Sequence, residues 1–101
     1  MAKLTEDEVK AAVEGWLGPL GQIHMSRGGP GSRITGWIMH PDFKGVMHAD
    51  RQGWLWNGFG EEGTLKPWKG LRETFKERSS QIGLILTYSP AEYENAFGQS
   101  A

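Results

Sequence analysis

The chain has 101 residues, 11 of them basic and 12 acidic, and this length fits one domain, so we expect a single domain over residues 1–101. The formal net charge of −1 at pH 7 gives no general attraction to nucleic acid or anionic membranes, and the absence of cysteine excludes disulfides, thiolate catalysis and cysteine-based zinc sites. Because no apolar run is long enough for a signal peptide or a membrane helix, we expect a cytoplasmic protein without a membrane partner.

The first predicted element is a helix that opens at Thr5. Thr5 and Glu8 have the spacing of a capping box, and apolar residues recur at helical spacing over residues 9–17. Gly18 ends the helix, since glycine takes a left-handed conformation at little cost and the next residue is proline. A short strand over residues 22–25 is expected to lead into a glycine-rich loop.

The middle of the chain predicts strands over residues 33–40, 46–50 and 54–59. The turn-rich stretches between them favour an antiparallel meander. The register set by these turns brings large apolar side chains together on one face of the sheet. These side chains include Trp37, Met39, Met47, Trp54 and Trp56.

Helical and aliphatic patterns alternate in the last third of the chain. An apolar stripe predicts a second helix near residues 67–79, and the aliphatic run 81–88 predicts a central or well-covered strand. A serine, a proline and a glutamate at helix-start spacing predict a short helix over residues 89–97. The expected fold is α+β, with an antiparallel sheet of four or five strands built on the meander, two main helices and the short C-terminal helix.

Histidine offers the only candidate for catalytic or metal chemistry. The predicted register places His40, His48 and Asp50 on one sheet face, where two imidazoles and a carboxylate can hold a metal ion or form an acid/base pair. Their spacing matches no established metal or catalytic signature. The glycine-rich loop over residues 27–33 lacks a Walker lysine and a dinucleotide fingerprint. We therefore expect no enzyme activity and no cofactor, and a metal- or ligand-binding enzyme is the second alternative.

Nucleic-acid binding is the first alternative. Basic residues gather on and just before the second helix, and exposed sheet aromatics would supply stacking. The basic residues are Lys66, Lys69, Arg72 and Lys76. Glutamates at positions 73 and 77 interleave with them, which is typical of a solvated helix face.

Binding to another protein is the favoured function. Both faces of the predicted sheet are apolar and two main helices are expected to cover them, which leaves one face for a protein partner or for a second copy in a homodimer. Tryptophan, methionine and arginine are typical of such contacts. The predicted contact residues are Trp37, Phe43, Trp54 and Trp56 on the sheet surface and Arg27, Arg33 and Arg51 at its rim. Such a module would modulate or inhibit its partner, by analogy of size and composition with phage or mobile-element inhibitors and immunity proteins.

Overall fold

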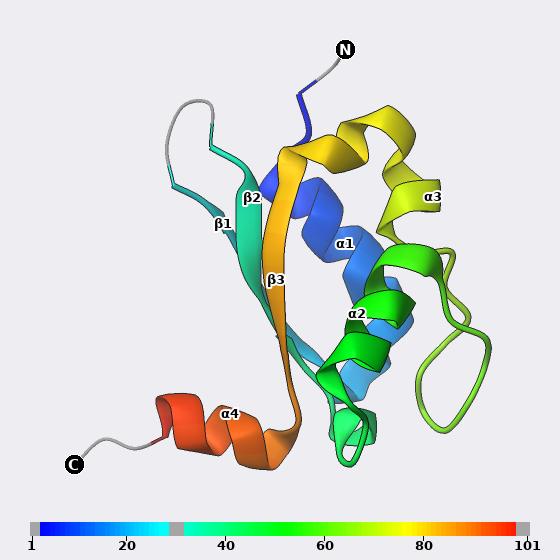
Figure 1. Cartoon of the computed structure of the whole chain (residues 1–101), viewed down its shortest axis with the longest axis vertical. Coiled ribbons are helices and arrows are strands. Elements are labelled where there is room, and N and C mark those ends of the chain that lie inside the picture. Colours follow the sequence, from blue (N-terminus) through cyan, green and yellow to red (C-terminus); the bar gives the residue numbers. More distant parts are fainter. Residues whose placement is uncertain (1–2, 29–31, 99–101) are drawn as a thin grey trace.

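One mixed sheet organises the part of the chain that the computed structural model describes, residues 3–28 and 32–98. Its three strands have the order β1-β2-β3, with β1 antiparallel and β3 parallel to the central β2 (Figure 1). The strands are β1 (Gln22–Arg27), β2 (Ile34–Met39) and β3 (Ile82–Tyr88), and the helices are α1 (Glu6–Leu17), α2 (His48–Asn57), α3 (Leu71–Phe75) and α4 (Pro90–Phe97). The α+β class is confirmed, whereas an antiparallel sheet of four or five strands is wrong.

The helices at the two ends of the chain form where the sequence predicts them. Thr5 caps α1, because its side-chain oxygen accepts a hydrogen bond from the Glu8 backbone amide at 3.2 Å. Gly18 ends α1 with a φ of 69°. Ser89 and Glu92 form a reciprocal capping box at the start of α4. Local side-chain to backbone hydrogen bonds therefore define both helices.

The largest difference from the sequence prediction lies at residues 46–59, where a helix replaces two predicted strands. α2 buries Arg51 and Leu55, which lie one helical turn apart, against the rest of the protein. Its N-cap residue, Met47, makes no capping hydrogen bond, and Gly53 in its interior is a poor helix former. Packing of the buried side overrides these weak local signals. The meander is therefore wrong, and so is the sorting of residues into faces that followed from it.

The connection from β2 to β3 explains why these strands are parallel. A parallel pair needs a long crossover, and residues 40–81 supply it through α2 and α3. In the strand order β1-β2-β3, β3 lies at an edge of the sheet, whereas the sequence predicts a central or well-covered strand. α3 begins later than the predicted start at residue 67, because Gly70 has a φ of 93° and a β-carbon there would lie 2.5 Å from the Trp56 carbonyl oxygen.

The helices cover the two faces of the sheet unequally. α1, α2 and α3 lie on one side, and only α4 lies on the other, at the C-terminal end of β3 (Figure 1). The core fills the space under the first three helices, and its largest fully buried side chains include Trp16, Phe43, Leu55 and Ile85. No helix of the described residues is both long enough and apolar enough to cross a membrane.

Candidate functional site

The outer face of the sheet, turned away from α1, exposes apolar side chains. Strand alternation places Trp37 of β2 and the side chains at positions 84, 86 and 88 of β3 on this face. Leu84 is 64% exposed and Leu86 is 44% exposed. We call this surface, together with the α4 residues that adjoin it, the open face. Its residues are Trp37, Leu84, Leu86, Tyr88, Tyr93 and Phe97.

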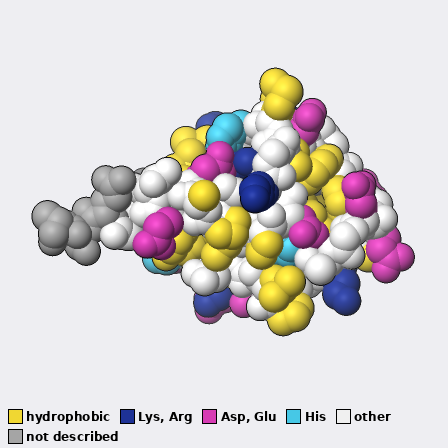
Figure 2. Space-filling view, turned by 90° about the horizontal axis from the view of Figure 1, so that it is seen from below, with side chains coloured by type: hydrophobic (Ala, Val, Ile, Leu, Met, Phe, Trp, Pro, Cys, Tyr) yellow, Lys and Arg dark blue, Asp and Glu magenta, His cyan; other side chains and the backbone are white. Residues whose placement is uncertain are grey.

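Aromatic rings cluster around Trp37 at one end of the open face. The Trp37 ring centroid lies 5.0 Å from that of Tyr93 and 5.3 Å from that of Phe97. Tyr88 completes the cluster, 5.6 Å from Phe97. Phe97 remains 50% exposed despite these contacts. Seen from the end where α4 lies, hydrophobic side chains reach the surface in several patches with acidic groups between them (Figure 2).

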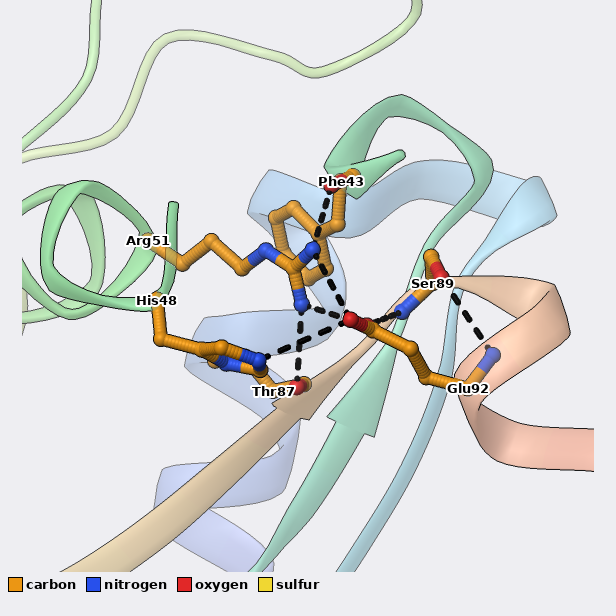
Figure 3. A network of polar contacts seen from close by, with 6 residues as sticks. All are labelled: Phe43, His48, Arg51, Thr87, Ser89 and Glu92. Atoms are coloured by element: carbon orange, nitrogen blue, oxygen red, sulfur yellow. Dashed lines mark hydrogen bonds and ion pairs between the residues drawn. The ribbon is translucent and has the colours of Figure 1, made fainter. Parts of the chain in front are cut away.

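A buried arginine holds α4 in position beside this cluster. Arg51 is 2% exposed, and its guanidinium donates hydrogen bonds to the carbonyl oxygens of Phe43 at 2.7 Å and Thr87 at 3.2 Å. It also donates to Glu92 Oε1 at 2.6 Å, which ties α2 to the first turn of α4 (Figure 3). The exposed His48 contributes a further contact, with its Nε2 3.5 Å from Glu92 Oε2.

Glu92 is the electrostatic centre of this network. The Arg51 hydrogen bond and a hydrogen bond from the Ser89 backbone amide lower the pKa of Glu92 to about 2. The carboxylate therefore stays ionised at neutral pH and accepts hydrogen bonds from two elements at once. The network anchors the aromatic side chains of α4 against the sheet.

The free edge of β3 is already occupied by side chains of α2. Gln52 Nε2 donates to the Ile85 carbonyl oxygen at 2.7 Å, and Arg51 donates to the Thr87 carbonyl oxygen. These carbonyls belong to the edge row that an added strand would use. These two β3 carbonyl oxygens are therefore already engaged within the protein.

The structure does not bring the predicted contact residues onto one surface. Trp37 lies on the open face, while Phe43 and Arg51 are buried in the network below it. Trp54 and Trp56 belong to α2 and pack half-buried against the core. Of the remaining arginines, Arg27 is half-buried and donates to the carbonyl oxygens of Leu4 and Ser32, and Arg33 is exposed.

Sequence reasoning missed most of the open face. Two signals could have found it: the alternation of Leu84 and Leu86 in a strand, and the spacing of Tyr93 and Phe97 one helical turn apart on the terminal helix. The run 81–88 is instead predicted as a central or well-covered strand, because a long aliphatic run is typical of one, and the prediction for residues 89–97 is a short helix with no surface role.

The proposed histidine site does not assemble. His40 is fully buried, its Nδ1 accepts a hydrogen bond from the Asp42 amide at 2.9 Å, and burial lowers its pKa. His48 and Asp50 are instead exposed residues of α2. Among the described residues no group of three or more histidine, cysteine, aspartate or glutamate side chains is arranged to hold a metal ion.

The basic residues of the nucleic-acid alternative are exposed, but they are engaged unequally. Arg72 donates to Asn57 Oδ1 and lies over the Trp56 ring at 5.7 Å. Lys76 pairs with Glu73 at 2.8 Å, in an i, i+3 contact of a solvated helix. Lys66 and Lys69 form no ion pair with a described residue.

Comparison of this chain with protein-family models, with curated proteins and with solved structures gives no match. The class defined by the geometry is a small α+β domain with three helices on one side of the sheet and, on the other, α4 beside exposed apolar side chains.

Proposed function

We propose that this protein is a non-enzymatic module that binds another protein through the open face and thereby modulates or inhibits it. The observation that carries the proposal is the exposure of Leu84, Leu86 and Phe97, at 64%, 44% and 50%, around the Trp37 cluster. Leu84 and Leu86 are outward neighbours on one strand, and a large exposed apolar patch is typical of an interaction site.

The chemistry of the open face supports burial against a protein. The outward positions of β3 carry two leucines and a tyrosine, without a charged side chain that would lose hydration on contact. Tryptophan and tyrosine supply most of the binding energy in many interfaces. The rings of Trp37 and Tyr93 already contact each other, so little side-chain entropy remains to be lost.

The shape of the sheet favours a helix as the docking element. On the opposite side of the sheet, α1 packs through its apolar stripe, chiefly against β1. A partner helix with an apolar stripe fits the open face in the same way, beside α4. Addition of a strand at β3 is disfavoured, because Arg51 and Gln52 cap its edge carbonyls.

Affinity capture with two matched variants tests the proposal. Leu84→Asp places a charge in the open face, whereas Met47→Asp places the same charge at a residue that is 71% exposed at the start of α2. We expect the wild type and Met47→Asp to retain one stoichiometric partner from a host extract, and Leu84→Asp to lose it. Retention of that partner by Leu84→Asp would contradict the proposed surface.

Two further measurements separate the alternatives. A concentration-dependent dimer in sedimentation velocity that Leu84→Asp abolishes would assign the open face to a second copy. Retarded DNA or RNA that weakens steeply with salt and is released by Lys66→Glu with Lys69→Glu would favour the nucleic-acid alternative. The present geometry favours protein binding, because two of that alternative's four basic side chains are already engaged.

A further inference from the structure

A pocket of about 200 Å³ opens in the helical layer of the protein, among α2, the short helix Pro41–Phe43 and the loop that follows α2. It is separate from the open face, which lies across the sheet. Its lining combines aromatic, aliphatic and acidic side chains. These include Trp54, Phe59, Val46, Leu65, Asp42 and Glu62.

Two aromatic rings form a wall of this pocket. The centroids of Trp54 and Phe59 lie 4.7 Å apart with an angle of 60° between the ring planes. Both side chains are half-buried and pack against the core, which fixes their orientation. The face of an aromatic ring attracts a cation electrostatically, and tryptophan does so most strongly.

The Asp42 carboxylate is held rigidly at the pocket. Its Oδ2 accepts hydrogen bonds from the Thr64 backbone amide at 2.8 Å and from the Thr64 hydroxyl at 3.0 Å. The backbone hydrogen bond is the main reason that the pKa of Asp42 lies below its ordinary value, so the carboxylate carries its charge at neutral pH.

The buried His40 supports this arrangement from behind. Its Nδ1 accepts from the Asp42 amide, so the neutral ring carries its hydrogen on Nε2. Nε2 lies 3.4 Å from the Thr64 hydroxyl oxygen, which is free to accept because the hydroxyl hydrogen is donated to Asp42. The His40 ring thus lies beside the Thr64 hydroxyl that donates to the carboxylate, and the Leu17 backbone is a further hydrogen-bond partner of the ring.

Negative charge in the pocket is not neutralised by the protein itself. No lysine, arginine or histidine lines the pocket, and neither Asp42 nor Glu62 forms an ion pair with a described lysine or arginine. Aromatic walls and uncompensated carboxylates in one concave site are the features by which proteins recognise organic cations.

We propose that this pocket binds one small organic cation, a guanidinium or alkylammonium group. The volume of about 200 Å³ lies below the roughly 300–1,000 Å³ of sites for whole drug-sized ligands, and it suits a single cationic head group. The group can belong to a free amine or to an arginine or lysine side chain of another protein. This site and the open face are independent, so either proposal can fail without the other.

A nuclear magnetic resonance titration that compares a cation with a neutral compound of similar shape tests the cation site. Methylguanidinium is compared with methylurea, which has a similar shape without the charge, while the indole Nε1–H signal of Trp54 is followed and assigned through Trp54→Phe. We expect saturable shifts with a Kd on the order of millimolar for methylguanidinium, and none with methylurea.

Paired variants of neighbouring glutamates make the test specific. Glu62→Gln removes a carboxylate of the pocket lining, whereas Glu61→Gln removes the adjacent one, which does not line it. We expect the first to weaken binding about fivefold, the factor for loss of roughly 1 kcal/mol, and the second to leave it unchanged. Asp42→Asn, which keeps an acceptor for Thr64, should weaken binding at least as much.

Several results would overturn the cation site. They are the absence of saturable shifts up to about 50 mM methylguanidinium, equal shifts with methylurea, or equal weakening by Glu61→Gln and Glu62→Gln. A capped Gly-Arg-Gly peptide, compared with its neutral citrulline analogue, distinguishes the two sources. Tighter binding of the peptide than of methylguanidinium would support an arginine of a protein, and the reverse order would support a free cation.

Discussion

The two faces of the sheet use tryptophan differently. On the inner face Trp16 is 1% exposed, and its ring stacks on Trp68 with centroids 5.9 Å apart. On the outer face Trp37 is half-buried among rings of α4, and the neighbouring Leu84 stays mostly exposed. Tryptophan is therefore part of the core on one side of the sheet and part of the partly exposed surface on the other.

The difference follows from how much helix the chain supplies to each face. On the inner side α1 packs on β1, α2 packs on β3 and α3 packs on α2, and only α4 reaches the outer face (Figure 1). α4 buries none of its side chains completely, so it covers the Trp37 end of the face and leaves the leucines uncovered. Stability is concentrated on the inner face, and binding is proposed for the outer face.

The strongest test of this contrast is truncation of one tryptophan on each face. Trp16→Ala removes a fully buried ring and should cost about 3–5 kcal/mol in the free energy of unfolding, or prevent folding altogether. Trp37→Ala should cost about 1–2 kcal/mol, because water already reaches part of the ring. Urea unfolding measures both values, and equal losses would contradict the assignment of separate roles.

Removing the Arg51 hydrogen bonds, which connect α2 to α4 across the sheet, should have the next largest effect on the free energy of unfolding. Arg51→Met keeps much of the aliphatic stem but leaves the buried carbonyl oxygens of Phe43 and Thr87 without their donor. We expect a loss of about 2–4 kcal/mol in the free energy of unfolding, as for other buried polar groups left unpaired. Acrylamide quenching of tryptophan fluorescence should rise as α4 loosens over Trp37. Unchanged stability would show that Arg51 is not an anchor.

Sequence reasoning was accurate where local chemistry determines the structure. The capping residues Thr5 and Ser89 define α1 and α4 through hydrogen bonds to nearby backbone amides. The predicted strand over residues 33–40 and the aliphatic run 81–88 likewise correspond to β2 and β3. These signals act within a few residues, so the sequence contains all of the information needed to predict them.

The same reasoning failed where distant contacts determine the structure. From the sequence, Arg51 is expected at the protein surface. Its burial depends on Glu92 and on the Thr87 carbonyl oxygen, which are far away in the chain. Without those partners the aromatic and glycine content of residues 46–59 favours strands. The candidate site shared this error, since Trp54 and Trp56 were placed on a sheet that contains neither.

The pH dependence of stability tests the Glu92 contact without removing the arginine. Because the pKa of Glu92 falls from an ordinary 4.5 to about 2 on folding, its contribution is fully present above pH 4.5 and is lost as the pH falls toward 2. Glu92→Gln should therefore have a lower Tm than the wild type at neutral pH. The difference should shrink between about pH 5 and pH 2, and a constant difference across this range would contradict the assigned ionisation.

Leu84→Asp, which is expected to abolish binding of the partner, should have the smallest effect on the free energy of unfolding. Leu84→Asp alters a side chain that is 64% exposed, so the free energy of unfolding should change by no more than about 0.5 kcal/mol. Ile85→Asp, one residue further along β3, places the same charge at a fully buried position and should unfold the protein. Circular dichroism during urea unfolding distinguishes the two variants. If Leu84→Asp lowered the free energy of unfolding as much as Ile85→Asp, Leu84 would be needed for the fold. The proposal that this leucine serves to bind a partner would then be contradicted.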